Sequence, residues 1–276
     1  MNLVIQGVGM DAAVAAQAAA LSRADSSEQV GEFAWRLRSA ALPDEVALFC
    51  ESRSLDCAWV PEGRRFADLG LLAMDMDSTL ITIECIDEIG GMLGIKDRIA
   101  AITASAMRGE IDYPESLRRR VKLLAGLDEA ALLRVYEEKL ALSPGAEQLI
   151  AGCKRHGIKL LLVSGGFTFF TDRLKARLSI DYTISNVLGI ANGKLTGELV
   201  GRIVDAGVKA ERFRKITAEL GAHREQTVAI GDGANDLLMM AEAGVSVAYH
   251  AKPVVRAQAT CALTYSGLDG VLNLFE

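Results

Sequence analysis

The stretch LLAMDMDSTLITIECIDEIG, residues 71–90, decides how this chain folds. Its apolar start is typical of a buried strand, and that strand ends in two acids, Asp75 and Asp77, with one residue between them. Aspartate is disfavoured inside strands, and a buried charge is costly unless it has a partner. Two acids at the end of a core strand therefore indicate a functional site there rather than a role in packing.

Two further apolar strands end in polar loops. KLLLV runs into Ser164-Gly165-Gly166, and TVAI runs into GDGAND, residues 231–236. Ligands bind at the carboxyl ends of the strands in an open parallel sheet, so we expect the three loops to meet at one edge. Their carboxylates, hydroxyls, amides and glycines suit a divalent cation and a phosphate, because magnesium prefers oxygen ligands.

The pattern around these strands predicts an α/β fold. Residues 85–140 are helical and charged, and they follow the first acidic loop, where a lid that excludes water would belong. Beyond them, the helix predicted at 143–157 precedes the strand at 158–166, and Asn-Gly at 192–193 predicts a hairpin turn. Apolar strands that alternate with helices favour a parallel sheet covered on both faces.

Residues 1–64 form a separate pattern, which predicts a small α+β unit. WVPEGRRFADLG, residues 59–70, contains Pro and Gly and is typical of a linker. The elements expected before it are a strand at 2–7, a helix at 11–24, a second helix at 28–40 and two short strands within 46–60.

Charge and composition exclude several classes of protein. The chain has 30 basic and 36 acidic side chains among 276 residues, and the net charge of −6 argues against broad binding to nucleic acid or anionic membranes. A net negative charge is still compatible with a locally positive pocket that binds an anionic substrate. No apolar run reaches the roughly 20 residues of a membrane helix, and the start of the chain lacks the basic region of a signal peptide.

Cysteine and histidine usage narrows the chemistry further. The five cysteines are scattered and form no CxxC pair, which favours reduced thiols and a cytoplasmic location. The three histidines, His156, His223 and His250, are far apart, which argues against a histidine zinc site or a Ser-His-Asp triad.

Together the polar loops resemble the motifs of the haloacid dehalogenase-like phosphatases. DMDSTL at 75–80 resembles the first motif, Ser164-Gly165-Gly166 the second, Lys209 the third and residues 231–236 the fourth. The order and spacing agree from about residue 66 onward. Within that superfamily, DMDSTLI-x-x-E-x-I-D-E, SLRRRV and VSGGF are similar to the phosphoserine phosphatase family.

That resemblance implies a domain organisation. A Rossmann-like parallel-sheet domain would span 65–276, with a helical cap at about 85–140 inserted after the first strand. The unit at 1–64 resembles the ACT-like domains that precede some members. The role of that unit stays open among dimerisation, binding of serine as an inhibitor, and support of the fold.

The resemblance also implies an activity and a set of site residues. The reaction would be magnesium-dependent hydrolysis of O-phosphoserine through an aspartyl-phosphate, the last step of serine biosynthesis. Asp75 would be the nucleophile and Asp77 the general acid and base. Mg²⁺ would be held by the Asp75 carboxylate, the Asp77 main-chain carbonyl and Asp232, with Asp236 as a supporting or alternative ligand. The remaining site residues would be Ser164, Gly165, Lys209 and Asn235 for the phosphoryl oxygens, and Glu84 and Arg120 for the amino acid.

Physical chemistry gives each acid a distinct requirement. An ordinary aspartate pKa of about 3.9 would leave Asp75 ionised and ready to attack. Repulsion from the phosphate would then be offset by the metal and Lys209. Asp77 must keep a proton near neutral pH, so we expect its pKa to be raised. We expect Met107, Tyr113 and Val121 to form an apolar wall, and the cap to hinge near 82–84 and 141–144.

Two other functions stay open at this point. The first is another small-metabolite phosphatase or phosphotransferase of the same superfamily, which the roles of Glu84 and Arg120 would distinguish. The second is a regulatory module that senses an amino acid through residues 1–64, which the intact acidic motifs disfavour. A homodimer is compatible with either function.

Overall fold

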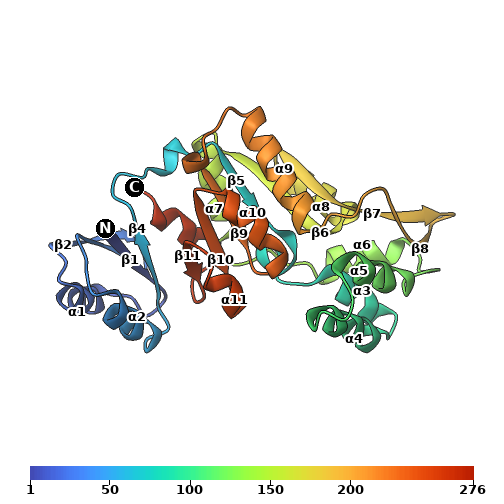
Figure 1. Ribbon diagram of the computed structural model, residues 1–276, viewed down its shortest axis with the longest axis horizontal. Helices are drawn as coiled ribbons and strands as arrows, with labels where there is room; N and C mark the ends of the chain where they lie inside the picture. The colour runs from blue at the N-terminus through green and yellow to red at the C-terminus, as the bar shows by residue number, and fades with distance from the viewer.

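The computed structural model describes residues 1–276, and it contains two β-sheets. A four-stranded sheet has the order β2-β3-β1-β4, and a seven-stranded sheet has the order β11-β10-β9-β5-β6-β7-β8. Figure 1 shows the small sheet at one end of the molecule, the large sheet in the middle and a group of helices at the other end.

The large sheet is parallel except for one edge hairpin. Its strands are β5 (Leu71–Met74), β6 (Lys159–Phe167), β7 (Tyr182–Ala191), β8 (Lys194–Val200), β9 (Thr227–Gly231), β10 (Val245–Tyr249) and β11 (Cys261–Leu263). Only β7 and β8 pair antiparallel. Asn192 and Gly193 connect them with φ values of 51° and 73°, so the predicted hairpin turn is confirmed.

Helices cover both faces of this sheet, as the alternating pattern predicts. On one face, Leu71, Ala73 and Leu161 pack against α9 (Ala206–Glu219) and α10 (Leu237–Glu242). On the other, Leu72, Met74 and Leu162 pack against α7 (Ala146–Arg155) and α8 (Thr168–Leu178). The α/β class with a mostly parallel sheet is therefore confirmed.

Strand β5 lies at the centre of the site because it is paired with β6 on one side and with β9 on the other. Met74 at its end pairs with Ile230 of β9 on one side and with Leu162 of β6 on the other. The loops that follow these three strands therefore leave the sheet next to one another, as the sequence predicts.

Four of the helices between β5 and β6 form the cap. They are α3 (Cys85–Met92), α4 (Lys96–Met107), α5 (Tyr113–Lys122) and α6 (Ala130–Glu138). The two connections to this cap lie side by side, because Ile81 pairs with Leu142 and the Thr82 N–H donates to the Ala141 carbonyl at 3.0 Å. The cap also contacts the β7–β8 hairpin, where Gly126 N–H donates to Leu195 O at 2.8 Å (Figure 1).

The small sheet belongs to a βαββαβ unit. Its elements are β1 (Asn2–Gln6), α1 (Ala12–Ser22), β2 (Ser26–Gly31), β3 (Ala34–Arg38), α2 (Pro43–Glu51) and β4 (Asp56–Val60). This order is the ferredoxin-like arrangement, which agrees with the ACT-like α+β unit expected at the start of the chain.

Two of the elements expected in that unit are wrong. Residues 28–40 form the β2–β3 hairpin instead of a helix, with Trp35 and Leu37 on the face that α1 and α2 cover. Within 46–60, the first expected strand is helix α2, which begins at Pro43 and carries Asp44 and Glu45 in its first turn. Proline at a helix start and acids in the first turn are both helix-start signals, and they decide this segment.

The C-terminal segment lies between the two sheets. Its 3₁₀ helix η5 (Leu268–Leu274) packs on α7, and Arg36 of β3 donates to the Phe275 carbonyl at 2.6 Å. None of the helices in this structure combines the length and the apolar composition needed to span a bilayer.

Candidate active site

A cavity of about 590 Å³ lies where the cap faces the carboxyl ends of β5, β6 and β9. It is lined by Asp75, Asp77 and Asp232 from the core and by Glu84 and Arg120 from the cap side. Five carboxylates and two cationic side chains line it in all, when Asp87 and Lys252 are included. The excess of acids favours a cation in this cavity.

The first acidic loop places Asp75 at the floor of the cavity. Its backbone is extended like that of β5, and Met76–Leu80 then forms one wide helical turn. The Asp75 carboxylate accepts the Met76 N–H at 2.7 Å, and its residue is 4% exposed. Met76 is fully buried in the core, as the alternation predicts. Ser78 has a left-handed φ of 55°, a strained conformation of the kind that collects at functional sites.

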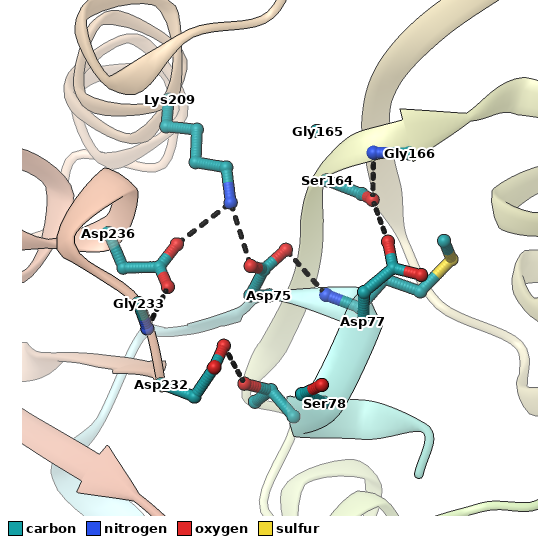
Figure 2. Close-up of polar contacts among 12 residues, drawn as sticks. Asp75, Asp77, Ser78, Ser164, Gly165, Gly166, Lys209, Asp232, Gly233 and Asp236 are labelled. Atoms are coloured by element: carbon teal, nitrogen blue, oxygen red, sulfur yellow. Dashed lines mark hydrogen bonds and ion pairs between the residues drawn. The ribbon is translucent and has the colours of Figure 1, made fainter. Parts of the chain in front are cut away.

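Lys209 of α9 bridges two acids beneath the cavity (Figure 2). Its Nζ lies 2.9 Å from an oxygen of Asp75 and 2.8 Å from one of Asp236. Lys209 is 1% exposed, and burial alone would lower its pKa. Asp236 and Asp75 more than reverse that effect and raise the pKa above its ordinary value, so the ammonium stays charged.

Three carboxylates form a cluster that can hold a metal ion. Single oxygens of Asp75, Asp232 and Asp236 all lie within 4.8 Å of one another. The Asp77 side chain is outside the cluster, because its oxygens accept the Cys85 N–H at 2.8 Å and the Ser164 hydroxyl at 3.3 Å. Asp236 is thus grouped with Asp75 and Asp232, which is compatible with its expected role as a supporting or alternative ligand, and it also pairs with Lys209.

Burial changes the charge state of these acids. Desolvation and the neighbouring Asp236 raise the pKa of Asp75 well above its ordinary value, against the opposing effect of Lys209. The same two causes raise the pKa of Asp232 to about 6. Desolvation also raises the pKa of Asp77, as expected for a proton donor. The pKa of Asp75 therefore differs from the ordinary value expected for it, because burial and Asp236 oppose its ionised form while Lys209 favours it.

The loop after β6 lies against these acids. The Ser164 hydroxyl, which donates to Asp77, also accepts the Gly166 N–H at 2.8 Å. A Cβ at residue 166 would lie 2.7 Å from an Asp77 oxygen and 2.8 Å from the Met76 terminal carbon. Glycine avoids these contacts, so the loop can bring its backbone close to Asp77 and the cavity.

The cap contributes the side chains expected to bind the amino acid. Glu84, just before α3, accepts the Ser78 hydroxyl at 2.7 Å and is exposed to the open cavity. Desolvation by the surrounding protein, with Asp77 nearby, raises the pKa of Glu84 to about 7. Arg120 is half-buried in the cavity wall, whereas Arg118 and Arg119 are exposed, so the structure singles out one arginine of SLRRRV.

Most expected site residues meet in one place, with three qualifications. Asn235 and Gly165 line the cavity, but Ser164 and Lys209 lie behind its surface, 0% and 1% exposed. Ser164 contacts the cavity residue Asp77, and Lys209 contacts the cavity residue Asp75. Met107 and Tyr113 line the cavity, but the expectation for Val121 is wrong, since it is 1% exposed inside the cap core.

Sequence reasoning missed two charged residues of the cavity wall, Asp87 and Lys252. Lys252 follows β10, which is the neighbour of β9, and its N–H donates to the Asp232 carbonyl at 3.3 Å. The strand-end rule would have found it if it had been applied to a fourth strand. Asp87 lies three residues after Glu84, the spacing that places two side chains on one face of a helix.

Comparisons with known proteins agree with this geometry. A family model described as haloacid dehalogenase-like hydrolase matches residues 72–241, and a model of a domain of unknown function matches residues 3–46. The phosphoserine phosphatase of Albidiferax ferrireducens is 54% identical over 217 residues, which cover 77% of this chain and 92% of that protein.

Solved structures give the same result. The unliganded crystal structure of a probable phosphoserine phosphatase from Vibrio cholerae superposes with a TM-score of 0.88 at 38% identity, covering 99% of this chain and 86% of that one. A substrate-bound phosphoserine phosphatase complex superposes with a TM-score of 0.71 at 35% identity, covering 75% of this chain and 99% of that one. The chain therefore belongs to the haloacid dehalogenase-like hydrolases and, within them, to the phosphoserine phosphatase family.

Proposed function

We propose that this phosphatase hydrolyses O-phosphoserine to serine and phosphate with Mg²⁺ as its metal. The observation that carries the proposal is the acidic cluster with Lys209 at the floor of a cavity whose roof holds Glu84 and Arg120. A floor for phosphate and a roof for an amino acid match the two halves of phosphoserine. The names of the relatives support the same substrate.

The donor set of the cluster fits a magnesium ion. All three grouped side chains offer carboxylate oxygens, which hard cations prefer, and no histidine or cysteine is among them. In this proposal Asp75, Asp232 and the Asp77 main-chain carbonyl hold the ion, and Asp236 orients Lys209. When bound, the ion supplies positive charge that favours the ionised form of Asp75 and offsets the charge of the phosphate.

Asp75 is the proposed nucleophile. Its carboxylate attacks phosphorus, the bond to the serine oxygen breaks, and an aspartyl-phosphate forms on residue 75. Lys209, 2.9 Å from that carboxylate, places its charge beside the group that reacts. Stabilisation of this kind by preorganised charge is the main contribution that a protein makes to phosphoryl transfer.

Asp77 is the proposed general acid and base. Its raised pKa lets it hold a proton, which it gives to the departing serine oxygen. The carboxylate so formed then takes a proton from the water that cleaves the aspartyl-phosphate. The Cys85 N–H and the Ser164 hydroxyl fix both of its oxygens, so the acid keeps one orientation through the two steps.

Recognition of the amino acid is assigned to the cap. Glu84 accepts the substrate ammonium, and Arg120 donates to the substrate carboxylate, for which a guanidinium is the better two-pronged partner. Ser164, Gly165 and Asn235 offer hydroxyl, N–H and amide donors to the phosphoryl oxygens. The cap closes by motion at residues 82–84 and 141–144 in this proposal.

A wider assignment follows for the rest of the chain. Residues 1–64 are proposed as an ACT-like domain and 65–276 as the phosphatase domain, with pairing of two chains as one possible role of the first. We also assign the chain to a reducing, cytoplasmic setting, which the five free cysteines support. Its place at the last step of serine biosynthesis is a proposal that follows from the proposed reaction.

A phosphate-release screen tests the function directly. Phosphoserine, phosphothreonine and simple sugar phosphates are each assayed with and without Mg²⁺. We expect phosphoserine to give the highest kcat/KM, and Arg120→Ala to remove that preference. A sugar phosphate preferred over phosphoserine would replace the substrate, and no release from any ester would favour the regulatory module.

A further inference from the structure

The carbonyl oxygen of Gly165 is held from two sides. The Asn186 side-chain amide of β7 donates to it at 2.8 Å, and the Tyr113 hydroxyl at the start of α5 donates to it at 3.3 Å. Gly165 lies in the loop to which the proposed function assigns the phosphoryl group. The donor from β7 belongs to the core sheet, while the donor from α5 belongs to the cap.

Asn186 makes a second bond with the other end of its carboxamide. Its side-chain oxygen accepts the Val204 N–H at 2.8 Å, and the residue is 2% exposed. Val204 lies just before helix α9, which carries Lys209. Because the donor and the acceptor of one planar group are both engaged, the amide cannot turn without losing a buried bond.

The β6–β7 pairing shows why this side chain is needed. The register runs from Val163 opposite Ile184 to Phe167 opposite Asn186. Residues 164–166 of β6 therefore face a single residue, Ser185, so the loop bulges out of the sheet between two paired positions. A bulge changes the direction of the backbone, here toward the site. The Asn186 amide holds the bulged Gly165 peptide in place through its hydrogen bond to the Gly165 carbonyl.

We propose that Asn186 is a positioning residue for phosphoryl transfer, which fixes the Ser164–Gly166 loop and ties it to the start of α9. Asn186 thereby helps to position two side chains of the site, Ser164 and Lys209. The loop keeps the Ser164 hydroxyl 3.3 Å from Asp77, and the Val204 bond fixes the backbone that leads to Lys209. This inference rests on the proposed function, because it takes the loop to bind the phosphoryl group.

Two variants separate the bonds of Asn186. Asn186→Asp keeps the shape and the acceptor for Val204 but sets an oxygen against the Gly165 carbonyl, whereas Asn186→Ala removes both bonds. We expect each to lower kcat for phosphoserine by about 10- to 100-fold, the effect of small misplacements in a site. Calorimetry with inorganic phosphate and Mg²⁺ should show affinity weakened by about tenfold in both.

The matched control is Asn273→Asp, in the C-terminal segment between the two sheets and outside the lining of the cavity. Asn273 is half-buried, and its side-chain amide donates to the Gln6 side chain at 2.7 Å. We expect this variant to shift the thermal unfolding midpoint but to keep the kcat and phosphate affinity of the parent. Measuring the midpoint of every variant separates lost activity from lost folding.

The inference is overturned if folded Asn186→Asp and Asn186→Ala both keep the phosphate affinity and kcat of the parent. It is also overturned if Asn186→Asp, which retains the Val204 bond, behaves as the parent while only Asn186→Ala fails. Phosphate affinity is independent of which ester is the substrate. A parent whose phosphate affinity depends on Asn186 but which does not cleave phosphoserine would therefore refute the substrate and keep this inference.

Discussion

Two buried aspartates of this chain have opposite surroundings. Asp56 of β4 is 5% exposed, and its oxygens accept three backbone N–H groups at the C-terminal segment, from Thr264 at 2.7 Å, Ser266 at 2.8 Å and Tyr265 at 3.1 Å. Asp75 is 4% exposed, with one backbone N–H and Lys209 as partners. Asp236 and Asp77 add like charge to it.

The difference separates a structural acid from a reactive one. The fold itself supplies the donors that Asp56 needs, so its charge joins the small sheet to the C-terminal segment. The fold crowds Asp75 with further acids and gives them a single buried ammonium. A cluster of that kind is stabilised only when more positive charge arrives, which couples its stability to a metal and its chemistry to an anion.

The largest expected effect is that of Asp75→Asn. The amide keeps the size but cannot attack phosphorus, so we expect kcat for phosphoserine to fall by about 10⁴-fold or more, as when other nucleophiles are removed. The free energy of unfolding should change little, because Lys209 keeps Asp236. Steady-state phosphate release and urea unfolding measure the two quantities.

The matched control for that variant is Asp56→Asn, a substitution of the same chemistry at a buried aspartate outside the cavity. It should keep kcat within about twofold and lower stability instead. The contrast fails if Asp75→Asn retains substantial turnover, or if Asp56→Asn loses as much activity as stability.

The second largest effect on activity is expected from removal of the metal. Chelation should reduce activity to background, because the phosphate then meets five cavity carboxylates with only Lys209, Lys252 and Arg120 to offset them. Added Mg²⁺ should restore activity and raise the thermal midpoint of the parent. We expect a much smaller rise with Asp232→Asn, which loses one carboxylate of the cluster. Full activity after exhaustive chelation, verified by elemental analysis, is incompatible with the account.

Asp56→Ala should be the most destabilising single change outside the core. It leaves the three N–H groups of residues 264–266 without their acceptor, and we expect a loss of about 2–4 kcal/mol in the free energy of unfolding. Asp44→Ala, at an exposed acid of α2, is the control and should cost only a few tenths. Equal losses for the two variants would show that Asp56 does not join the segments.

The acids of the cavity predict a pH dependence for the metal-free protein. The pKa values of Glu84 and Asp232 are raised to about 7 and about 6 from ordinary values of 4.5 and 3.8. Between the ordinary and the raised values the folded chain binds more protons than the unfolded chain, so stability falls as pH rises through that window.

Urea unfolding from pH 4 to pH 8, with and without Mg²⁺, measures this dependence. The ion should flatten the decline, since it favours the ionised acids. A metal-free protein whose stability rises steadily from pH 5 to pH 7 would show that other groups control the acid range.

The smallest expected effect belongs to the cap. Tyr113→Phe removes the 3.3 Å bond from α5 to the Gly165 carbonyl, and the loss of one long neutral bond should lower kcat/KM by about two- to fivefold. Tyr136→Phe, at a half-buried tyrosine that packs on the same core, is the control. Identical kinetics in the two variants would remove any role for the hydroxyl in holding the cap to the loop.

Much of the catalytic core could be predicted because its signals are local. An apolar strand is followed within a few residues by acids at Asp75, by glycines at Gly165 and by both at Asp232, and strand order then brings the three loops together. The cap helices and the hairpin at 192–193 carry similarly local patterns. These features need no knowledge of distant contacts, apart from the rule that strand ends meet.

The small sheet and several partners could not be predicted, because distant residues decide them. Arg36 is buried in β3, where it donates to the carbonyls of Asn273 and Phe275, far along the chain, and no local pattern at 28–40 reveals these contacts. Asp56 likewise depends on residues 264–266. The raised pKa of Asp75 is a property of the assembled cluster, which residue type alone does not reveal.

The central claim is that the crowded acid at residue 75, and not any other group, accepts the phosphoryl group. The most direct test is to quench the parent protein with acid during turnover of phosphoserine and to locate the phosphoryl group by peptide mass spectrometry after borohydride reduction. We predict a reduced residue at position 75 in samples with Mg²⁺, and none in chelated protein or in Asp75→Asn. A phosphoryl group trapped on a different residue would contradict it.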